Sequence, residues 1–176
     1  MITIAPSEID YENLYLNSFD YTDSIGPIPT PSILKTCEYT VNPETVFIDW
    51  AKVRPERIKV LQFQRFFTLA DRSNDVDRKG WHHLIEYIMH TYQDRDKYCF
   101  PGLEYEKYLI DHPDQIPESI RSIASNSHHY VGSMIQNAEN VVRIPAAVKT
   151  RQGLNCYTAP ALGDVGPYDY VVAVER

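Results

Sequence analysis

Cysteine and glycine are scarce in this chain, and it contains no long apolar run. The three cysteines stand far apart without a Cys-x-x-Cys pair, which argues against a disulfide framework and against a zinc knuckle. The seven glycines form no phosphate-cradling loop of the kind that leads from a strand into a helix. No stretch approaches the length needed to span a bilayer. We therefore expect an ordinary apolar core and no membrane partner.

The start of the chain also lacks the pattern of a secretory signal. Met1-Ile-Thr-Ile-Ala-Pro has no positive region followed by an apolar run, and the sequence contains no Asn-x-Ser/Thr acceptor site. These observations predict a cytoplasmic location. The 176 residues, 43% hydrophobic and 23% charged, have the composition of one globular domain.

Positive charge is in the minority, because the formal net charge is −7. Binding to nucleic-acid backbones needs clustered lysine and arginine, so nucleic acid is an improbable partner. One local exception comprises four cations against the single acid Glu56: Lys52, Arg54, Arg57 and Lys59. Such a patch can contact phosphate, although the solvated start of a helix explains it equally.

Aromatic residues are abundant, at 12% with 13 tyrosines, and tyrosine serves both in cores and at protein interfaces. Residues 1–36 show no sustained hydrophobic period and end in Pro27, Pro29 and Pro31, which favour extended backbone. We interpret them as an extended arm that lies on its own domain or on a neighbouring subunit. The candidate interaction residues in this arm are Tyr11, Tyr15, Phe19 and Tyr21.

The rest of the chain, residues 37–176, is predicted to be a single α+β domain. β-branched and aromatic residues predict strands near 37–50 and within 141–175, the latter as a meander of three strands over 141–149, 154–160 and 168–175. The last of these should be central, because Val171 to Val174 have the pattern of a strand buried on both faces. Pro145 would interrupt its strand unless that strand lies at an edge or carries a bulge.

Helices are predicted where apolar residues recur at three- and four-residue steps. The pattern predicts three long helices, over 56–70, 77–93 and 117–139, and a short one over 103–111 that ends at His112-Pro113. The simplest packing of these elements is a mostly antiparallel sheet against about three helices.

The helix predicted over 77–93 carries the candidate metal ligands. His83, Glu86 and His90 fall at i, i+3 and i+7 on one helical face, and imidazole with carboxylate is a typical ligand set for zinc or iron. His128 and His129 would complete the site if the helix over 117–139 lay alongside. However, the His83 face lies opposite the apolar stripe at about 100° per residue. Surface histidines are therefore the competing interpretation.

No nucleophile motif accompanies these residues, so the sequence favours a non-catalytic protein. We expect a protein–protein interaction or assembly protein without a cofactor. Either a subunit of a larger assembly, such as a viral particle, or a small inhibitor or regulator of another protein would fit. Its partner would be another protein or copies of itself. The alternative is a metal-dependent hydrolase with a divalent transition metal on His83, Glu86 and His90.

Overall fold

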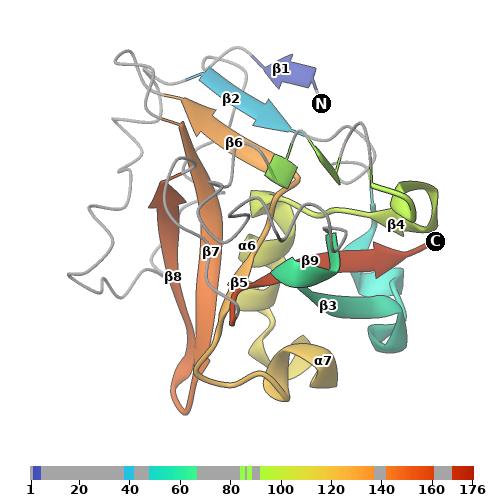
Figure 1. Ribbon diagram of the computed structural model, residues 1–176. Helices are drawn as coiled ribbons and strands as arrows, with labels where there is room; N and C mark the ends of the chain where they lie inside the picture. Colours follow the sequence, from blue (N-terminus) through green and yellow to red (C-terminus); the bar gives the residue numbers. More distant parts are fainter. Residues whose placement is uncertain are drawn as a thin grey trace.

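The computed structural model of the chain has an α+β fold built on a mixed sheet (Figure 1). It describes residues 2–4, 38–41, 48–66, 84, 85, 87, 88, 92–136, 142–160 and 168–176. In these residues, no helix is long and apolar enough to cross a membrane.

The sheet has nine strands within the described residues. They are β1 (Ile2–Ile4), β2 (Glu38–Val41), β3 (Ile58–Gln62), β4 (Tyr98–Cys99), β5 (Ser127–His129), β6 (Ser133–Gln136), β7 (Val142–Thr150), β8 (Gly153–Pro160) and β9 (Tyr170–Glu175). Their order is β1-β2-β6-β7-β5-β9-β3, with β8 paired to β7 and β4 paired to β9. Neighbouring strands are antiparallel, except that β5 runs parallel to β9.

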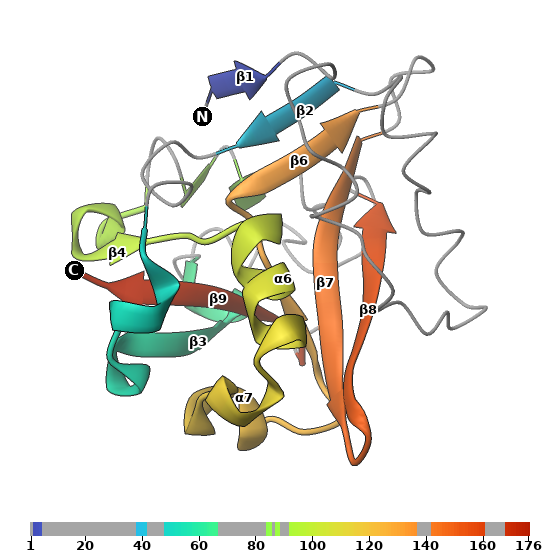
Figure 2. The same ribbon diagram turned by 180° about the vertical axis from the view of Figure 1, so that it is seen from behind.

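Two α-helices are delimited within the described residues, α6 (Leu103–Asp111) and α7 (Glu118–Arg121). Figures 1 and 2 show both on one face of the sheet, beside the β7–β8 hairpin. The short helix predicted over 103–111 is confirmed as α6 with the same bounds. Single turns of 3-10 helix occur at Trp50–Lys52, Pro55–Arg57, Phe63–Phe66, Arg95–Lys97 and Pro113–Gln115.

The helix predicted over 56–70 is wrong, because its described residues form a strand and short 3-10 turns and no α-helix. Ile58–Gln62 forms β3, which pairs along its whole length with β9, and a 3-10 turn follows at Phe63–Phe66. Pairing with the central strand overrides the local helical spacing, because it buries successive side chains on opposite faces of the sheet. Residues 67–70 lie outside the described residues.

The helix predicted over 117–139 is also wrong after its first turn. A helix does begin here, although Pro117 is its N-cap and not its first helical residue, and α7 ends at Arg121. Ser125 then takes a left-handed backbone conformation with φ of 72°, and the chain continues into strands β5 and β6. A left-handed residue cannot continue a right-handed helix. The prediction of about three helices is therefore not supported, although Leu84, Ile85, Tyr87 and Ile88 are helical, as expected within 77–93.

The late strands largely follow the prediction. β7, β8 and β9 match the segments 141–149, 154–160 and 168–175, and β7 and β8 form the expected hairpin. The meander is wrong in its last step, because β9 pairs with β3, β4 and β5 and not with β8. Near residues 37–50, β2 is confirmed, whereas Trp50 belongs to a 3-10 turn.

Both faces of the sheet are buried, and β9 shows this most clearly. Val171 and Ala173 belong to one apolar cluster, together with Phe63, Leu84 and Tyr157. Val172 and Val174 belong to the other, which lies under α6 and α7. β9 has β3 along one edge and β5 with β4 along the other, so its prediction as a central strand is confirmed.

Strands β5 and β6 lie one after the other along the same edge of β7, with a bulge at Tyr130–Gly132 between them. The Tyr130 N–H donates a hydrogen bond to the Pro145 carbonyl, with an N–O distance of 2.9 Å. The N–H and C=O of a strand residue point to the same neighbour, so the missing N–H of Pro145 faces the bulge. The proline is tolerated because the partner strand, rather than its own, carries the bulge.

A second backbone crosses this bulge at very short range. A Cβ atom on Gly132 would lie 2.1 Å from the Phe100 carbonyl oxygen, so the crossing requires glycine. The Gly132 N–H donates to the Pro101 carbonyl at 2.9 Å. The Ser133 hydroxyl accepts the N–H of Leu103 at 3.0 Å, which satisfies one free donor at the start of α6. The bulge thus fixes where α6 begins.

We predict that Gly132→Ala destabilises the protein strongly, because the added Cβ meets backbone that cannot rotate away. The free energy of unfolding should fall by about 3 kcal/mol, the upper part of the range for overpacking. Urea unfolding monitored by circular dichroism measures this. Ala51→Ser, at an exposed position, should change stability by less than about 0.5 kcal/mol. Equal stability of the two variants would contradict the crossing.

Candidate functional site

The residues chosen from sequence as metal ligands and arm contacts lie outside the described residues. This applies to His83, Glu86 and His90 and to Tyr11, Tyr15, Phe19 and Tyr21. Both assignments therefore stay predictions. Among the described residues, no group of three His, Cys, Asp or Glu side chains is arranged to hold a metal ion.

The two other histidines proposed for that site lie on β5 and not on a helix. His128 is 0% exposed and His129 is 2% exposed, so their interpretation as surface residues is wrong. Their rings point to opposite faces of the sheet, His128 against Tyr130 and His129 against Tyr157. Burial lowers the pKa of His128 to about 4 and that of His129 to about 3. Both are neutral core residues at neutral pH.

A buried carboxyl group lies beneath α6, which sequence reasoning did not identify. Glu106 is 1% exposed, and its carboxyl oxygens have no nitrogen or oxygen hydrogen-bond partner among the described residues, with the Cys156 thiol as a neighbour. Burial raises the pKa of Glu106 well above its usual value, and burial with the nearby Glu106 does the same for the Cys156 thiol. Glu106 lies three residues after Leu103 and three before Leu109, and this spacing places it on the apolar stripe of α6. That spacing was the available signal.

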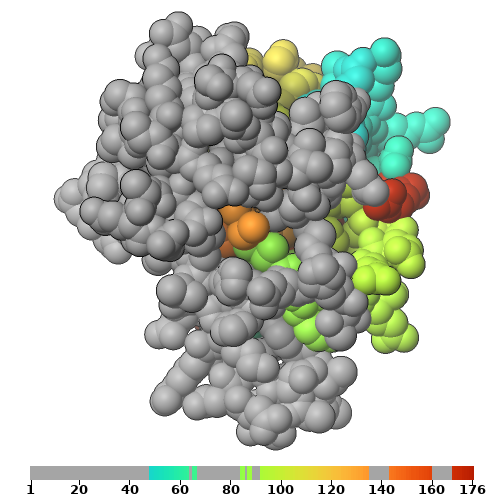
Figure 3. Space-filling model, turned by 90° about the horizontal axis from the view of Figure 1, so that it is seen from above, coloured from blue at the N-terminus to red at the C-terminus, as the bar shows by residue number. Residues whose placement is uncertain are grey.

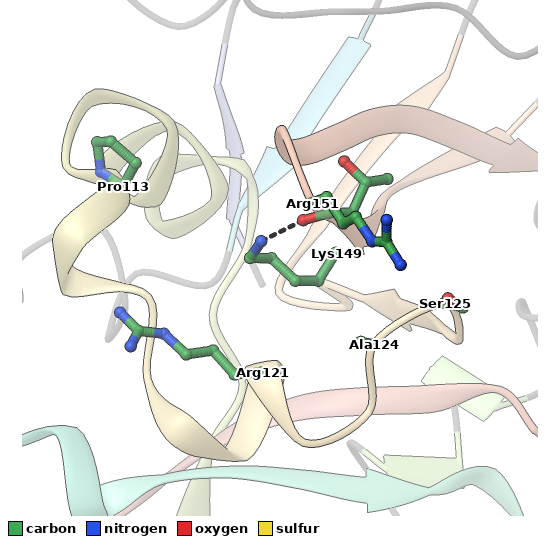
Figure 4. A pocket seen from close by; sticks show the side chains of 7 residues that line it. Pro113, Arg121, Ala124, Ser125, Lys149 and Arg151 are labelled. Atoms are coloured by element: carbon green, nitrogen blue, oxygen red, sulfur yellow. Dashed lines mark hydrogen bonds between the residues drawn. The ribbon is translucent and has the colours of Figure 1, made fainter.

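An open hollow of about 570 Å³ lies below this region, between α7 and the β7–β8 hairpin (Figure 4). The residues that line it are Pro113, Arg121, Ala124, Ser125, Lys149, Thr150 and Arg151. Arg121 comes from the last position of α7, whereas Lys149 and Arg151 come from the end of β7 and the hairpin turn. Its volume falls in the range of about 300–1,000 Å³ that is typical of ligand sites.

Local backbone structure holds the two walls of the hollow together. The left-handed Ser125 directs its N–H to the Lys149 carbonyl at 3.2 Å, which ties the turn after α7 to β7. On the other side, Gly153 has a φ of 140° and closes the two-residue turn between β7 and β8. The Thr150 hydroxyl donates to the Gly153 carbonyl at 3.2 Å and accepts the N–H of Gln152 at the same distance. These contacts fix the backbone that carries Lys149 and Arg151.

The three cations of the hollow have no carboxylate partner among the described residues. The Arg121 guanidinium donates to the Asp114 carbonyl oxygen at 3.1 Å, and the Lys149 ammonium donates to the Thr150 carbonyl oxygen. In Figure 4 the Lys149 ammonium group lies between the two guanidinium groups. Carbonyl oxygens carry only partial charge, so the described residues leave the hollow with a net positive charge.

The basic patch noted from sequence is different, because acidic groups offset its charge. Lys52 pairs with Asp49 at 2.7 Å, and Lys59 pairs with Glu175 at 3.5 Å. The Arg57 guanidinium donates to the Glu175 backbone carbonyl at 2.7 Å. Figure 3 shows these segments together at one side of the molecule, with the first residues of the 48–66 segment in cyan and the C-terminal residues in red.

Sequence reasoning missed the hollow because its cations are separated in the chain. Arg121 and Lys149 do not form a run of positive charge, and β5, whose pairing with β7 brings them together, was predicted as part of a helix. Comparisons with protein-family models, curated proteins and solved structures found no match for this chain. We therefore infer the function from the site itself.

We predict that Glu106→Gln removes a loss of stability at high pH. The folded-state pKa of Glu106 is raised above the unfolded value of 4.5, so its favourable contribution is complete below pH 4.5 and disappears as the pH rises through the folded pKa. Between pH 4.5 and the folded-state pKa, the free energy of unfolding of the wild type should fall by up to about 1.4 kcal/mol per pH unit, and that of Glu106→Gln should not. Urea unfolding between pH 5 and 9 measures it, with the exposed Glu118→Gln as control. Parallel curves for wild type and Glu106→Gln would refute the assignment.

We predict that His128 causes a loss of stability at low pH. Its folded-state pKa of about 4 lies below the unfolded value of 6.5, so stability is complete above pH 6.5 and is lost as the pH falls towards 4. His128→Leu should reduce the slope of unfolding free energy against pH by up to about 1.4 kcal/mol per unit in this window. The exposed His112→Gln should leave the slope unchanged. An unaltered slope in His128→Leu would show that the folded protein and the unfolded chain protonate His128 over the same pH range, which would contradict the lowered pKa.

Proposed function

We propose that this protein is a non-catalytic interaction or assembly protein whose basic hollow takes up an acidic segment of its partner, another protein or a copy of itself. One observation carries the proposal. Arg121, Lys149 and Arg151 line a single hollow without carboxylate partners among the described residues, on a chain whose formal net charge is −7.

The chemistry of the lining favours binding over reaction. Guanidinium and ammonium groups stay charged near neutral pH, so they supply attraction and hydrogen bonds and do not exchange protons in a catalytic cycle. Arginine also presents donors in a fork that matches a carboxylate. Carboxylates of a partner would supply the charge compensation that the Asp114 and Thr150 carbonyl oxygens provide only in part.

The arrangement of the cations favours an extended acidic segment over a single small anion. Arg121 stands on the α7 wall, Arg151 on the hairpin wall, and the Lys149 ammonium between them (Figure 4). Charges that are spread across a hollow are best matched by acids spaced along a chain. Steering by such a patch should also speed association at low ionic strength.

The test uses a fluorescein-labelled peptide of alternating glutamate and serine, titrated with the full-length protein. Fluorescence anisotropy should show binding that weakens at least about threefold in the combined variant Arg121→Ser, Lys149→Ser and Arg151→Ser, since exposed ion pairs contribute about 0.2–1 kcal/mol each. The same peptide with glutamine in place of glutamate should not bind.

A matched control removes positive charge elsewhere. Lys52→Ser with Arg54→Ser takes away exposed cations of the patch noted from sequence and should leave peptide affinity nearly unchanged. If the two sets of variants weaken binding equally, or if neither weakens it, the hollow is not the binding site and the proposal fails.

A further inference from the structure

We infer that the acidic segment taken up by the hollow is Glu8–Glu12 of a second copy of this chain. The inference depends on the proposed function, because it names the occupant of the same hollow. Three observations carry it: the spacing of acids in that segment, the cations of the hollow that lack a carboxylate partner among the described residues, and the distance between the hollow and the strand that precedes the segment.

Acidic and apolar residues alternate in this segment, which reads Glu8-Ile9-Asp10-Tyr11-Glu12. In extended backbone, alternate side chains point to the same side, so the three carboxyl groups would form a row with a spacing of about 6.5–7 Å. Ile9 and Tyr11 would point to the opposite side. Residues 1–36 as a whole contain five acids, Glu8, Asp10, Glu12, Asp20 and Asp23, against the single cation Lys35.

The hollow offers the complementary row. Arg121, Lys149 and Arg151 approach it from two walls, and none has a carboxylate partner among the described residues. Three acids against three cations leaves the contact neutral. The hydroxyl groups of Ser125 and Thr150 line the same space.

The three carboxyl groups of this segment cannot reach the hollow of their own chain together. Ile4 lies on the same rung of the sheet as Tyr39, Ile135 and Arg143, which places it three strands, or about 14 Å, from β7. From Arg143 to Lys149, β7 runs a further distance of about 20 Å. Figures 1 and 2 both show β1 and the β7–β8 turn at opposite ends of the molecule.

The chain length after β1 decides the question. Glu8 follows Ile4 by four residues, which span at most about 14 Å when fully extended. The displacements across the strands and along β7 are perpendicular, so the direct distance across the sheet from Ile4 to Lys149 is about 24 Å. Glu8 of the same chain therefore falls short of the hollow, whereas Glu12, eight residues after Ile4, could span about 28 Å. Only a second molecule can therefore place all three carboxyl groups in the hollow together.

This contact is head-to-tail, because each molecule donates a segment at its β1 end and accepts one at its α7 end. Such heterologous contacts build rings when the rotation closes and open chains when it does not. Association should therefore proceed beyond a dimer as the protein concentration rises.

The test exchanges the charges of the two surfaces in the full-length protein. One variant carries Glu8→Lys, Asp10→Lys and Glu12→Lys, and the other carries Arg121→Glu, Lys149→Glu and Arg151→Glu. Sedimentation velocity over a range of concentrations should show association of the wild type and at least tenfold weaker association of each variant alone. An equimolar mixture of the two should associate again, because each segment then meets a hollow of opposite charge.

A control variant carries Asp20→Lys and Asp23→Lys. Each of these substitutions changes the charge of residues 1–36 by as much as each substitution in Glu8–Glu12, and the variant should associate like the wild type. If the hollow variant is poorly folded, a mixture of the Glu8–Glu12 variant with wild type provides the test. In this mixture only the wild-type molecules carry an acidic segment that can dock. The association of this mixture should then be intermediate between that of the wild type alone and that of the variant alone.

The outcomes separate this inference from the proposed function. If the glutamate–serine peptide binds the hollow but the wild type stays monomeric, or if the mixed variants do not associate, the second-copy inference is overturned and the proposed function stands. If the peptide does not bind either, both fall.

Discussion

The crossing of Phe100–Gly102 over the bulge at Tyr130–Gly132 is the contact on which the remaining structure depends. Two backbones meet there with no side chain between them, because a Cβ on Gly132 would lie 2.1 Å from the Phe100 carbonyl oxygen. The bulge also accommodates Pro145 in a central strand, and Ser133 accepts the first free N–H of α6. One irregular segment thus sets the register of β5 and β6 on β7 and the position of the helix that covers them.

The hollow follows from the same register. Because Ser127 to His129 pair with Ala146 to Val148, the left-handed Ser125 comes against the Lys149 carbonyl and the end of α7 lies beside the β7–β8 turn. The cations on these two walls therefore face one space, whereas those near Glu175 are offset by ion pairs. The difference between the two basic regions lies in their acidic neighbours and not in the number of cations.

Sequence patterns predicted those elements whose local preference agrees with their environment. β7, β8, β9 and α6 are examples, since branched residues or apolar steps coincide there with burial. Residues 58–66 and 122–136 were misread as helix because apolar side chains at three- and four-residue steps also fit a strand followed by a turn. Gly132 and the Ser125-Asn-Ser segment were the available signals of a break. The hollow was beyond prediction, because it requires the pairing of β5 with β7.

Zero-length cross-linking between isotopically light and heavy chains tests the assembly most directly. A carbodiimide joins a carboxyl group to a lysine amine with loss of water, so a docked Glu8, Asp10 or Glu12 should become linked to Lys149. In an equimolar mixture of the two isotopic forms, mass spectrometry should find these links between light and heavy chains, and their yield should fall at high salt. Links from Glu8–Glu12 to Lys149 that occur only within one isotopic form, or no such links at concentrations where the protein associates, would contradict the account.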